Sequence, residues 1–393
     1  MRIQEHVSLS ELTTFHIGGN ARYFVSVETQ DELREAIHFA AEKDIPFVIF
    51  GGGSNMLVSD EGFPGLVLQI GIKGLEWQDD GATVLLIAGA GEKWDALVGF
   101  VVARGLWGVE NLSGIPGSVG ATPVQNIGAY GAEIREVLQW VEVFDPKTGA
   151  ISKMQNAECC FGYRDSIFKH PEGKRLIILR VAYRLKKEGK PNLSYKDVQQ
   201  FFIFQFSSAV DTREGTIFNE DEKKQKLETL TPQDIRRTVL AIRSKKFPDL
   251  NVMGTAGSFF KNPIIPLAHF EELKKKYPEL PGFPVDSSSP PARGGVPSRR
   301  GGVVGEGRNK RDGCVKISLA WILDHLCHMR GVVKGPTALF ERQPIVLVNT
   351  GGAKAEEVEA LAREVADCVR KKTGIEVEWE VAFIGGGKSR LAR

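Results

Sequence analysis

The sequence predicts a mixed fold, α/β or α+β, divided into two or three domains. Between about residues 12 and 145, short β-branched runs alternate with segments whose apolar residues recur at helical spacing. The chain has 393 residues, and a domain usually holds roughly 150, so more than one hydrophobic core is expected. These two observations together favour several sheets with helices packed against them.

The expected elements of the first half follow in chain order. Residues 31–41 and 93–104 have the apolar spacing of helices, whereas 46–50 and 83–88 are short runs typical of buried strands. A second strand-rich stretch covers about 137–186 and begins with a hairpin. The first half is therefore expected to supply most of the sheet structure.

The second half contains two irregular stretches. Residues 201–228 begin aromatic and end charged, which suggests a loop followed by the start of a helix. Residues 284–312 are rich in Ser, Pro, Gly and Arg and offer little to bury, so disorder is expected there. The remaining elements are expected as a helix at 317–328, a strand at 344–348, a helix at 354–372 and a final strand at 376–384.

Composition excludes several classes of protein. Hydrophobic content is 42%, charged content 25% and net charge +2, so neither nucleic-acid binding nor membrane insertion is expected. The N-terminus lacks the apolar core of a signal peptide. The five cysteines are few, odd in number and without CxxC spacing, which fits a reducing cytoplasm and argues against disulfides and a zinc site. His325 and His328 share a helix face without further ligands nearby, so no metal is expected.

Two glycine-rich segments are candidate binding loops. The run Gly51–Asn55 follows a predicted strand, and its backbone N–H groups can form a concavity for a diphosphate; the alternative is a plain tight turn. Residues 113–131 form a long run of small side chains, and long ordered loops are more often functional than structural. A third segment, 89–94, has Trp94 where a dinucleotide fingerprint requires glycine, so a Rossmann site is not supported.

Several side chains have a chemical and a structural interpretation. Arg164 can hold a carboxylate or a developing enolate, or can form an ion pair with a nearby acid. Ser258 lies between a glycine and two phenylalanines; it can donate a proton to a carbanion, or simply cap a turn. Tyr195 can belong to a lid over the site or be an ordinary loop tyrosine. Lys246 belongs to a basic pair, for which a solvated surface is the alternative. For Glu380 the structural interpretation is a surface carboxylate.

Taken in order, these segments resemble one family, the UDP-N-acetylenolpyruvoylglucosamine reductases, also called UDP-N-acetylmuramate dehydrogenases. No single segment is specific, but their ordered combination is, over about residues 12–385. The matching segments are Thr14–Gly19, Gly51–Leu57, Gly114–Gly131, Gly162–Lys169, Gly257–Pro263 and Glu380–Gly385.

The resemblance implies an α+β fold of the vanillyl-alcohol-oxidase type, with two FAD-binding subdomains and a substrate-binding domain. We expect the first subdomain at 1–70, completed by the C-terminal strand at 378–393, and the second at 71–245. The substrate-binding domain is expected at 246–377, with 284–312 as an insertion.

The resemblance also implies a reaction and its cofactors. NADPH reduces FAD, and the reduced flavin passes a hydride to the enolpyruvyl double bond of UDP-N-acetylglucosamine enolpyruvate. By this resemblance Arg164 and Glu380 stabilise the enolate-like species, and Ser258 protonates the carbon next to the carboxylate. A bare carboxylate would oppose that charge, so Glu380 is expected to be protonated or oriented by a partner.

The same resemblance assigns the binding residues. Tyr195 places the chain in the subclass that has a substrate-loop tyrosine. The substrate is expected to contact Tyr163, Tyr195, Lys246 and Asn262. The contacts expected for FAD are Gly51, Gly52, Gly53, Ser54, Asn55, Ser113, Gly114, Pro116, Gly117, Gly120, Ala121, Gln125, Asn126, Gly128, Ala129 and Tyr130.

Two other functions remain as alternatives. One is a different FAD oxidase or dehydrogenase of the same fold, which would need no proton donor such as Ser258. The other is a non-catalytic protein that binds a nucleotide sugar, which should lack Arg164, Ser258 or Glu380. The expected partners are a UDP-sugar and NADPH, and the chain is expected to be a monomer.

Overall fold

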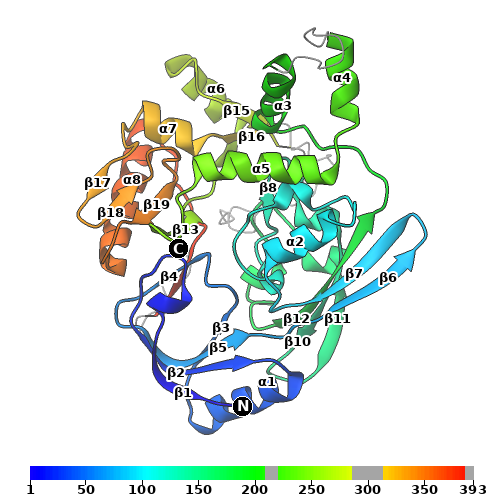
Figure 1. The fold of residues 1–393 in the computed structure, drawn as a ribbon. Coiled ribbons are helices and arrows are strands. Elements are labelled where there is room, and N and C mark those ends of the chain that lie inside the picture. The colour runs from blue at the N-terminus through cyan, green and yellow to red at the C-terminus, as the bar shows by residue number, and fades with distance from the viewer. Residues whose placement is uncertain (209–219, 286–312, 386–393) are drawn as a thin grey trace, which may run out of the picture.

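The computed structural model describes residues 1–208, 220–285 and 313–385. Figure 1 shows the N-terminal sheet at the bottom, a larger sheet on the right and the C-terminal elements on the left. The helices are α1 (Gln30–Glu42), α2 (Trp94–Val102), α3 (Lys196–Ser208), α4 (Glu220–Glu228), α5 (Pro232–Lys246), α6 (Leu267–Lys276), α7 (Leu319–His325) and α8 (Ala355–Thr373).

The N-terminal half contains two sheets that share one hydrophobic core. The first sheet has the order β1-β2-β5-β3. In it β5 pairs in parallel with both β2 and β3. The second sheet is antiparallel, in the order β11-β10-β12-β7-β6. Their strands are β1 (Gln4–Ser8), β2 (Asn20–Val27), β3 (Phe47–Phe50), β5 (Phe63–Ile70), β6 (Leu75–Asp80), β7 (Thr83–Gly89), β10 (Leu138–Phe144), β11 (Ile151–Gln155) and β12 (Ile177–Lys186).

The C-terminal half has a separate core, formed between α7, α8 and the sheet β13-β19-β18-β17. A smaller sheet, β14-β16-β15, lies beside α6. The strands are β13 (Gly254–Ser258), β14 (Ile264–Pro266), β15 (Gly282–Pro284), β16 (Cys314–Ile317), β17 (Val333–Lys334), β18 (Thr337–Leu339) and β19 (Val346–Asn349). Helix α8 ends where Gly374 adopts a left-handed φ of 71°, a common helix stop.

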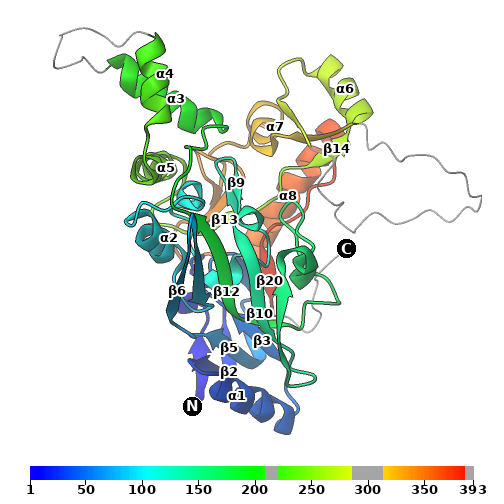
Figure 2. The ribbon, with the colours of Figure 1, turned by 90° about the vertical axis from the view of Figure 1, so that its right-hand side faces the viewer.

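The chain returns to its N-terminal half at its end. Strand β20 (Ala382–Ile384) pairs in parallel with β4 (Met56–Val58), directly after the glycine-rich turn 51–55. A short hairpin of β8 (Gly128–Ala129) and β9 (Ala132–Glu133) lies on the other glycine-rich loop. Figure 2 shows β20 close to the sheet strands of the N-terminal half, although it belongs to the far end of the sequence.

Helices α3 and α5 pack together above the second sheet. Val198, Phe202, Ile235 and Val239 form their shared apolar contact, to which Tyr130 is added from the glycine-rich loop. Helix α5 begins at a capping box, in which the Thr231 hydroxyl accepts from the N–H of Asp234. Figures 1 and 2 show α3 and α4 as a projection above α5.

The predicted α+β class is confirmed, and two local predictions are wrong. Residues 201–208 belong to helix α3 rather than to a loop, because Val198, Phe202 and Phe206 recur every four residues and pack on α5 or on each other. The final strand is limited to β20, since residues 376–378 have no strand partner in the described chain. Of the predicted disorder at 284–312, Pro284 belongs instead to strand β15, and residues 286–312 lie outside the described residues.

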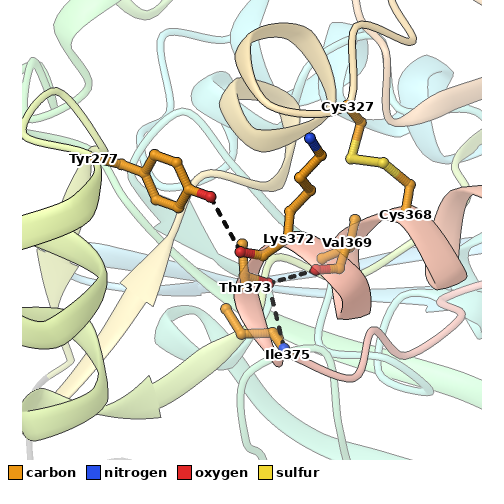
Figure 3. Close-up of a disulfide and its surroundings, with 7 residues drawn as sticks. All are labelled: Tyr277, Cys327, Cys368, Val369, Lys372, Thr373 and Ile375. Carbon is orange, nitrogen blue, oxygen red and sulfur yellow. Dashed lines mark hydrogen bonds between the residues drawn. A yellow bond between two sulfur atoms is a disulfide. The ribbon is translucent and has the colours of Figure 1, made fainter.

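The prediction about cysteines is also wrong. Cys327, just after α7, is joined to Cys368 of α8 by a disulfide that closes a separation of 41 residues. Figure 3 shows this bond beside the last turns of α8. The number of cysteines and their spacing in the sequence could not reveal the pair, because Cys327 and Cys368 meet only through the packing of α7 on α8. Cys159, Cys160 and Cys314 are free thiols.

Candidate active site

The two glycine-rich segments meet through their backbones. The turn 51–55 follows β3, and a Cβ built on Gly52 would lie 2.7 Å from the Cα of Gly117. The hydroxyl of Ser54 donates to the carbonyl of Pro116 at 3.1 Å. Only a residue without a side chain permits this approach, so the sequence of the turn is explained by a contact with the second loop. We call residues 51–55 and 113–121 the glycine interface.

The residues predicted to contact FAD lie in the glycine interface and in the loop that continues it. Ser113 and Asn126 use their polar groups within the protein: the Ser113 hydroxyl donates to the carbonyl of Glu110 at 2.6 Å, and the Asn126 amide donates to Glu133 and to the carbonyl of Gly162. The remaining predicted residues are Gly51, Gly52, Gly53, Ser54, Asn55, Gly114, Pro116, Gly117, Gly120, Ala121, Gln125, Gly128, Ala129 and Tyr130.

Arg164 and Glu380 form an ion pair despite their separation in sequence. The Nε of Arg164 lies 3.1 Å from Oε1 of Glu380, and its Nη2 donates to the carbonyl of Gly128 at 2.7 Å. Burial opposes the charge of the guanidinium, but Glu380 outweighs it and raises the pKa of Arg164. The pair lacks hydrogen-bond geometry, and within the described residues the buried Nε–H has no hydrogen-bond acceptor.

Backbone pairing places Glu380 next to the segment that carries Ser258. The N–H of Glu380 donates to the carbonyl of Phe259 at 2.8 Å, and the N–H of Lys261 donates to the carbonyl of Glu378 at 2.9 Å. Phe260 and Trp379 form the bridge between these two segments. Ser258 ends β13, and the residue that follows it, Phe259, is hydrogen bonded to Glu380.

Asn55 joins the glycine interface to the segment that carries Glu380. Its amide donates to Oε1 of Gln125 at 2.6 Å and to the carbonyl of Glu380 at 3.2 Å. Three segments distant in sequence thus meet at one side chain. The structure brings the predicted catalytic residues Arg164 and Glu380 together, with Ser258 on the adjoining strand; we call these three residues the charged cluster.

Tyr163 and Asn262 lie together at one edge of the charged cluster. Burial raises the pKa of the Tyr163 hydroxyl, and Asn262 lies beside it. The Asn262 carbonyl oxygen accepts from the N–H of Leu319 at 3.0 Å, which fixes the amide. Lys316 has its ammonium 5.2 Å from the centre of the Tyr163 ring. Both predicted substrate residues are thus held in place by the C-terminal half.

The other two predicted substrate residues form a separate group. Tyr195 packs edge to face on Tyr130 at 5.3 Å, and the Lys246 ammonium lies 5.6 Å from the Tyr195 ring. Lys246 also pairs with Asp197. Burial disfavours its charge, but this hydrogen bond prevails and raises the pKa of Lys246. Tyr130, predicted to contact FAD, thus packs directly against predicted substrate residues.

Sequence reasoning missed several basic residues around the site. Lys169 donates from its buried ammonium to the carbonyl of Arg164 at 3.3 Å, and burial, reinforced by Lys261, lowers the pKa of Lys169. Arg243 lies beside Tyr130, and burial lowers the pKa of its guanidinium. Lys169 ends the segment 162–169 that carries Arg164, so its place in that segment was an available signal. Arg243 had none, because a basic residue near the end of a helix is ordinary.

Comparisons with known proteins identify the family of the chain. Residues 21–155 match the family model of the FAD binding domain, and residues 248–384 match that of the C-terminal domain of UDP-N-acetylenolpyruvoylglucosamine reductase. The reductases of Chromobacterium violaceum and Pseudomonas aeruginosa are each 35% identical to the chain, and each alignment covers 97% of this chain and 98% of the relative.

A solved structure supports the fold. The crystal structure of UDP-N-acetylenolpyruvylglucosamine reductase from Thermus caldophilus superposes with a TM-score of 0.62 at 24% identity, over 98% of this chain and 100% of that one. The fold and its FAD-binding domain define the chain as an FAD-dependent oxidoreductase. It belongs to the family of UDP-N-acetylenolpyruvoylglucosamine reductases. The predicted family and the FAD cofactor are confirmed, whereas the domain boundaries and the role of each site residue stay predictions.

The residues present fit such a cofactor. The glycine interface presents closely spaced backbone in place of side chains, as a diphosphate requires, and the buried N–H of Arg164 has no acceptor in the described chain. No group of three or more His, Cys, Asp or Glu side chains arranged to hold a metal ion occurs in residues 1–208, 220–285 and 313–385. In the same residues no helix has the length and apolar character needed to cross a membrane.

Proposed function

We propose that the chain uses NADPH to reduce UDP-N-acetylglucosamine enolpyruvate to UDP-N-acetylmuramate. The observation that carries this proposal is the meeting of Arg164 and Glu380, 3.1 Å apart, beside the strand that carries Ser258. When bound, FAD supplies the hydride carrier between NADPH and the enolpyruvyl double bond. The protein's own residues then have to bind the substrate carboxylate, stabilise the charge that builds on it, and supply a proton.

Arg164 is suited to the first two tasks. A guanidinium has five N–H donors in a planar fork, and it stays charged. In the described chain only Nη2 donates to a protein acceptor, the carbonyl of Gly128, so donors remain for a carboxylate. A fixed cation beside the site where negative charge develops lowers the barrier, because it need not reorganise during the reaction.

Glu380 acts on this reaction through Arg164. Its main chain is fixed by the pairing with Phe259 and by Asn55, so its carboxylate holds the guanidinium in one position. A bare carboxylate would oppose the negative charge of an enolate, but Glu380 is not bare. Its charge is matched by Arg164, and the substrate meets the other edges of the same guanidinium.

Ser258 is the proposed proton donor. In the described residues its hydroxyl has no hydrogen-bond partner, so the turn-capping alternative has no support. The hydride adds to the terminal carbon of the enolpyruvyl group, and the Ser258 hydroxyl gives its proton to the carbon next to the carboxylate. A weakly acidic hydroxyl suits this step because an enolate carbon is strongly basic.

Substrate binding is assigned to the two residue groups around the charged cluster. Lys246 and Tyr195 lie in one group, and the ammonium of Lys246 can meet a diphosphate. Tyr163 and Asn262 lie in the other group, on the side of the C-terminal core. The nucleotide sugar would span these two groups, with its enolpyruvyl end at Arg164.

Ser258→Ala provides the decisive experiment. The two half-reactions can be followed separately by stopped-flow absorbance of the flavin. Flavin reduction by NADPH should stay within about twofold of the unaltered protein, whereas flavin reoxidation by substrate should slow by about 10²-fold or more. Equal slowing of both half-reactions would remove Ser258 from the proton-donor role. If NADPH did not reduce the flavin of the unaltered protein, NADPH would be overturned as the hydride donor.

Two properties of the whole protein belong to the same proposal. We expect the chain to act as a monomer and to work in the cytoplasm. Light scattering coupled to size-exclusion chromatography tests the first, and cell fractionation with an antibody tests the second.

A further inference from the structure

The start of helix α2 is bound to the second glycine-rich loop by three successive contacts. The indole N–H of Trp94 donates to the carbonyl of Leu112 at 3.0 Å, and its backbone N–H donates to the carbonyl of Gly117 at 3.0 Å. Asp95 completes the set, because its Oδ1 accepts from the N–H of Gly114 at 2.5 Å. Segment 89–94 lacks a dinucleotide fingerprint, and these contacts explain what its end does instead.

Asp95 has a second partner on helix α5. Arg236 donates from Nη1 to Oδ1 at 2.6 Å and from Nη2 to Oδ2 at 2.9 Å, a two-pronged pair that fixes both side chains. Arg236 is 19% exposed and Asp95 is 39% exposed. Burial disfavours the Asp95 charge, but Arg236 and the Gly114 amide outweigh that cost and lower the pKa of the carboxyl.

Gly114 lies directly against helix α5. A Cβ built on it would lie 2.9 Å from Leu240 and 3.0 Å from the Cδ and Nε of Arg243. Its φ of +71° is a conformation that side chains disfavour. The helix that packs here also ends in Lys246, so one carboxylate fixes both a loop of the glycine interface and the helix that carries two basic site residues.

We propose that Asp95 and Arg236 are a positioning pair, which sets the loop at Gly114 against helix α5 and so aligns the cofactor loop with the substrate residues. This inference rests on the proposed function, since it takes Gly114 as part of the FAD contact and Lys246 as part of the substrate contact. Neither side chain of the pair is assigned a contact with cofactor or substrate. Their effect is transmitted by the amide of Gly114 and by the placement of α5.

Affinity measurements on a small set of variants test the pair. Asp95→Ala removes both contacts, Asp95→Asn keeps an acceptor for Gly114 but loses the charge, and Arg236→Leu removes only the partner on α5. The dissociation constant of FAD is measured by quenching of flavin fluorescence on flavin-free protein. We expect about tenfold weaker binding for Asp95→Ala and a smaller loss for Asp95→Asn.

Arg236→Leu should act mainly on the substrate. We expect KM for the UDP-sugar to rise about fivefold to tenfold while kcat changes by less than about twofold, because the helix carrying Lys246 loses its anchor. Arg236→Lys, which keeps a charge, should recover part of this loss. Arg237→Leu is the matched control: Arg237 is the next residue of α5 and pairs only loosely with Asp234, at 3.8 Å, with 78% of its side chain exposed.

The outcomes separate the inference from the proposed function. If the unaltered protein binds FAD and reduces the substrate, the proposed function stands, whatever the variants do. If the Asp95 and Arg236 variants then keep FAD affinity and KM within about twofold, the positioning pair is overturned. Should Asp95→Ala fail to fold, the double variant Asp95→Asn with Arg236→Leu decides the matter, because a true pair gives less than the product of the single effects.

Discussion

The glycine interface and the charged cluster adjoin one another but are built by different means. The glycine interface is made by backbone: Gly52 and Gly117 approach so closely that a single Cβ would not fit, and few side chains take part. The charged cluster is made by side chains from three distant segments, held in register by the pairing of 378–380 with 259–261. The first should respond to changes of shape and the second to changes of charge.

Arg164→Met gives the largest expected effect and separates the two regions. Loss of the guanidinium removes the fixed charge beside the substrate carboxylate and leaves Glu380 without its partner, so flavin reoxidation by substrate should slow by about 10³-fold. FAD affinity should change by less than about threefold. Stopped-flow absorbance and flavin titration measure the two quantities.

A surface arginine supplies the control for that experiment. Arg175 pairs with Asp145, the residue after β10, and is 48% exposed, so Arg175→Met should leave both quantities unchanged. If Arg164→Met abolished FAD binding as strongly as substrate reduction, the distinction between the two regions would be lost.

The disulfide offers a test confined to the C-terminal half. Its removal by Cys327→Ser should lower the free energy of unfolding by about 2–4 kcal/mol, because it releases a loop of 41 residues in the unfolded chain. The glycine interface packs on the N-terminal core through Ile115 and Val119, so FAD affinity should not change. Urea unfolding measures stability, and Cys314→Ser, at an exposed free thiol, is the control. Equal stability with and without the bond would show that the pair is not formed in solution.

Gly52→Ala tests the glycine interface itself. The added methyl would meet the Cα of Gly117 at 2.7 Å, so the two loops must separate, and FAD binding should weaken by about tenfold. Gly81→Ala, in the exposed turn between β6 and β7, is the control, since its Cβ meets nothing within 4 Å. Unchanged FAD affinity in Gly52→Ala would mean that the close approach is not needed for binding.

This contrast also explains what could be predicted from the sequence. The glycine interface could be proposed from local sequence, because glycines at 51–53 directly after a strand let the backbone approach a partner closely, although a plain tight turn was the alternative. The pair of Arg164 and Glu380 is not, because spacing cannot show which distant acid meets an arginine; only the family resemblance placed them together. Asp95, Arg236 and the disulfide were missed for the same reason, since each depends on packing between elements.

The missed helix α3 differs, because its signal was present. Val198, Phe202 and Phe206 stand four residues apart, which is a helical period, but a stretch that begins aromatic and ends charged suggested a loop followed by the start of a helix. The short final strand shows the opposite error. Residues 376–380 alternate like a strand, yet they meet the segment 259–261 only through a bridge, and that irregular pairing is what carries Glu380 into the site.

The smallest expected effect concerns the free energy of unfolding and its dependence on pH through Lys169, whose ammonium donates to the carbonyl of Arg164 beside the charged cluster. Burial, and then the charge of Lys261, lowers the pKa of Lys169 below its usual 10.5. Between that lowered value and 10.5 the unfolded chain binds more protons at this residue than the folded chain does. Stability contributed by Lys169 is therefore complete above 10.5 and is lost as the pH falls through the lowered value.

Lys169→Met removes this titration and so should change the slope of stability with pH. The free energy of unfolding in urea, measured at pH 8.5 and 10.5, should rise more with pH in the unaltered protein than in the variant. Lys174→Met, at an exposed lysine of the same loop, is the matched control. Identical slopes in the two proteins would mean that the ammonium beside Arg164 is as well solvated as a surface lysine.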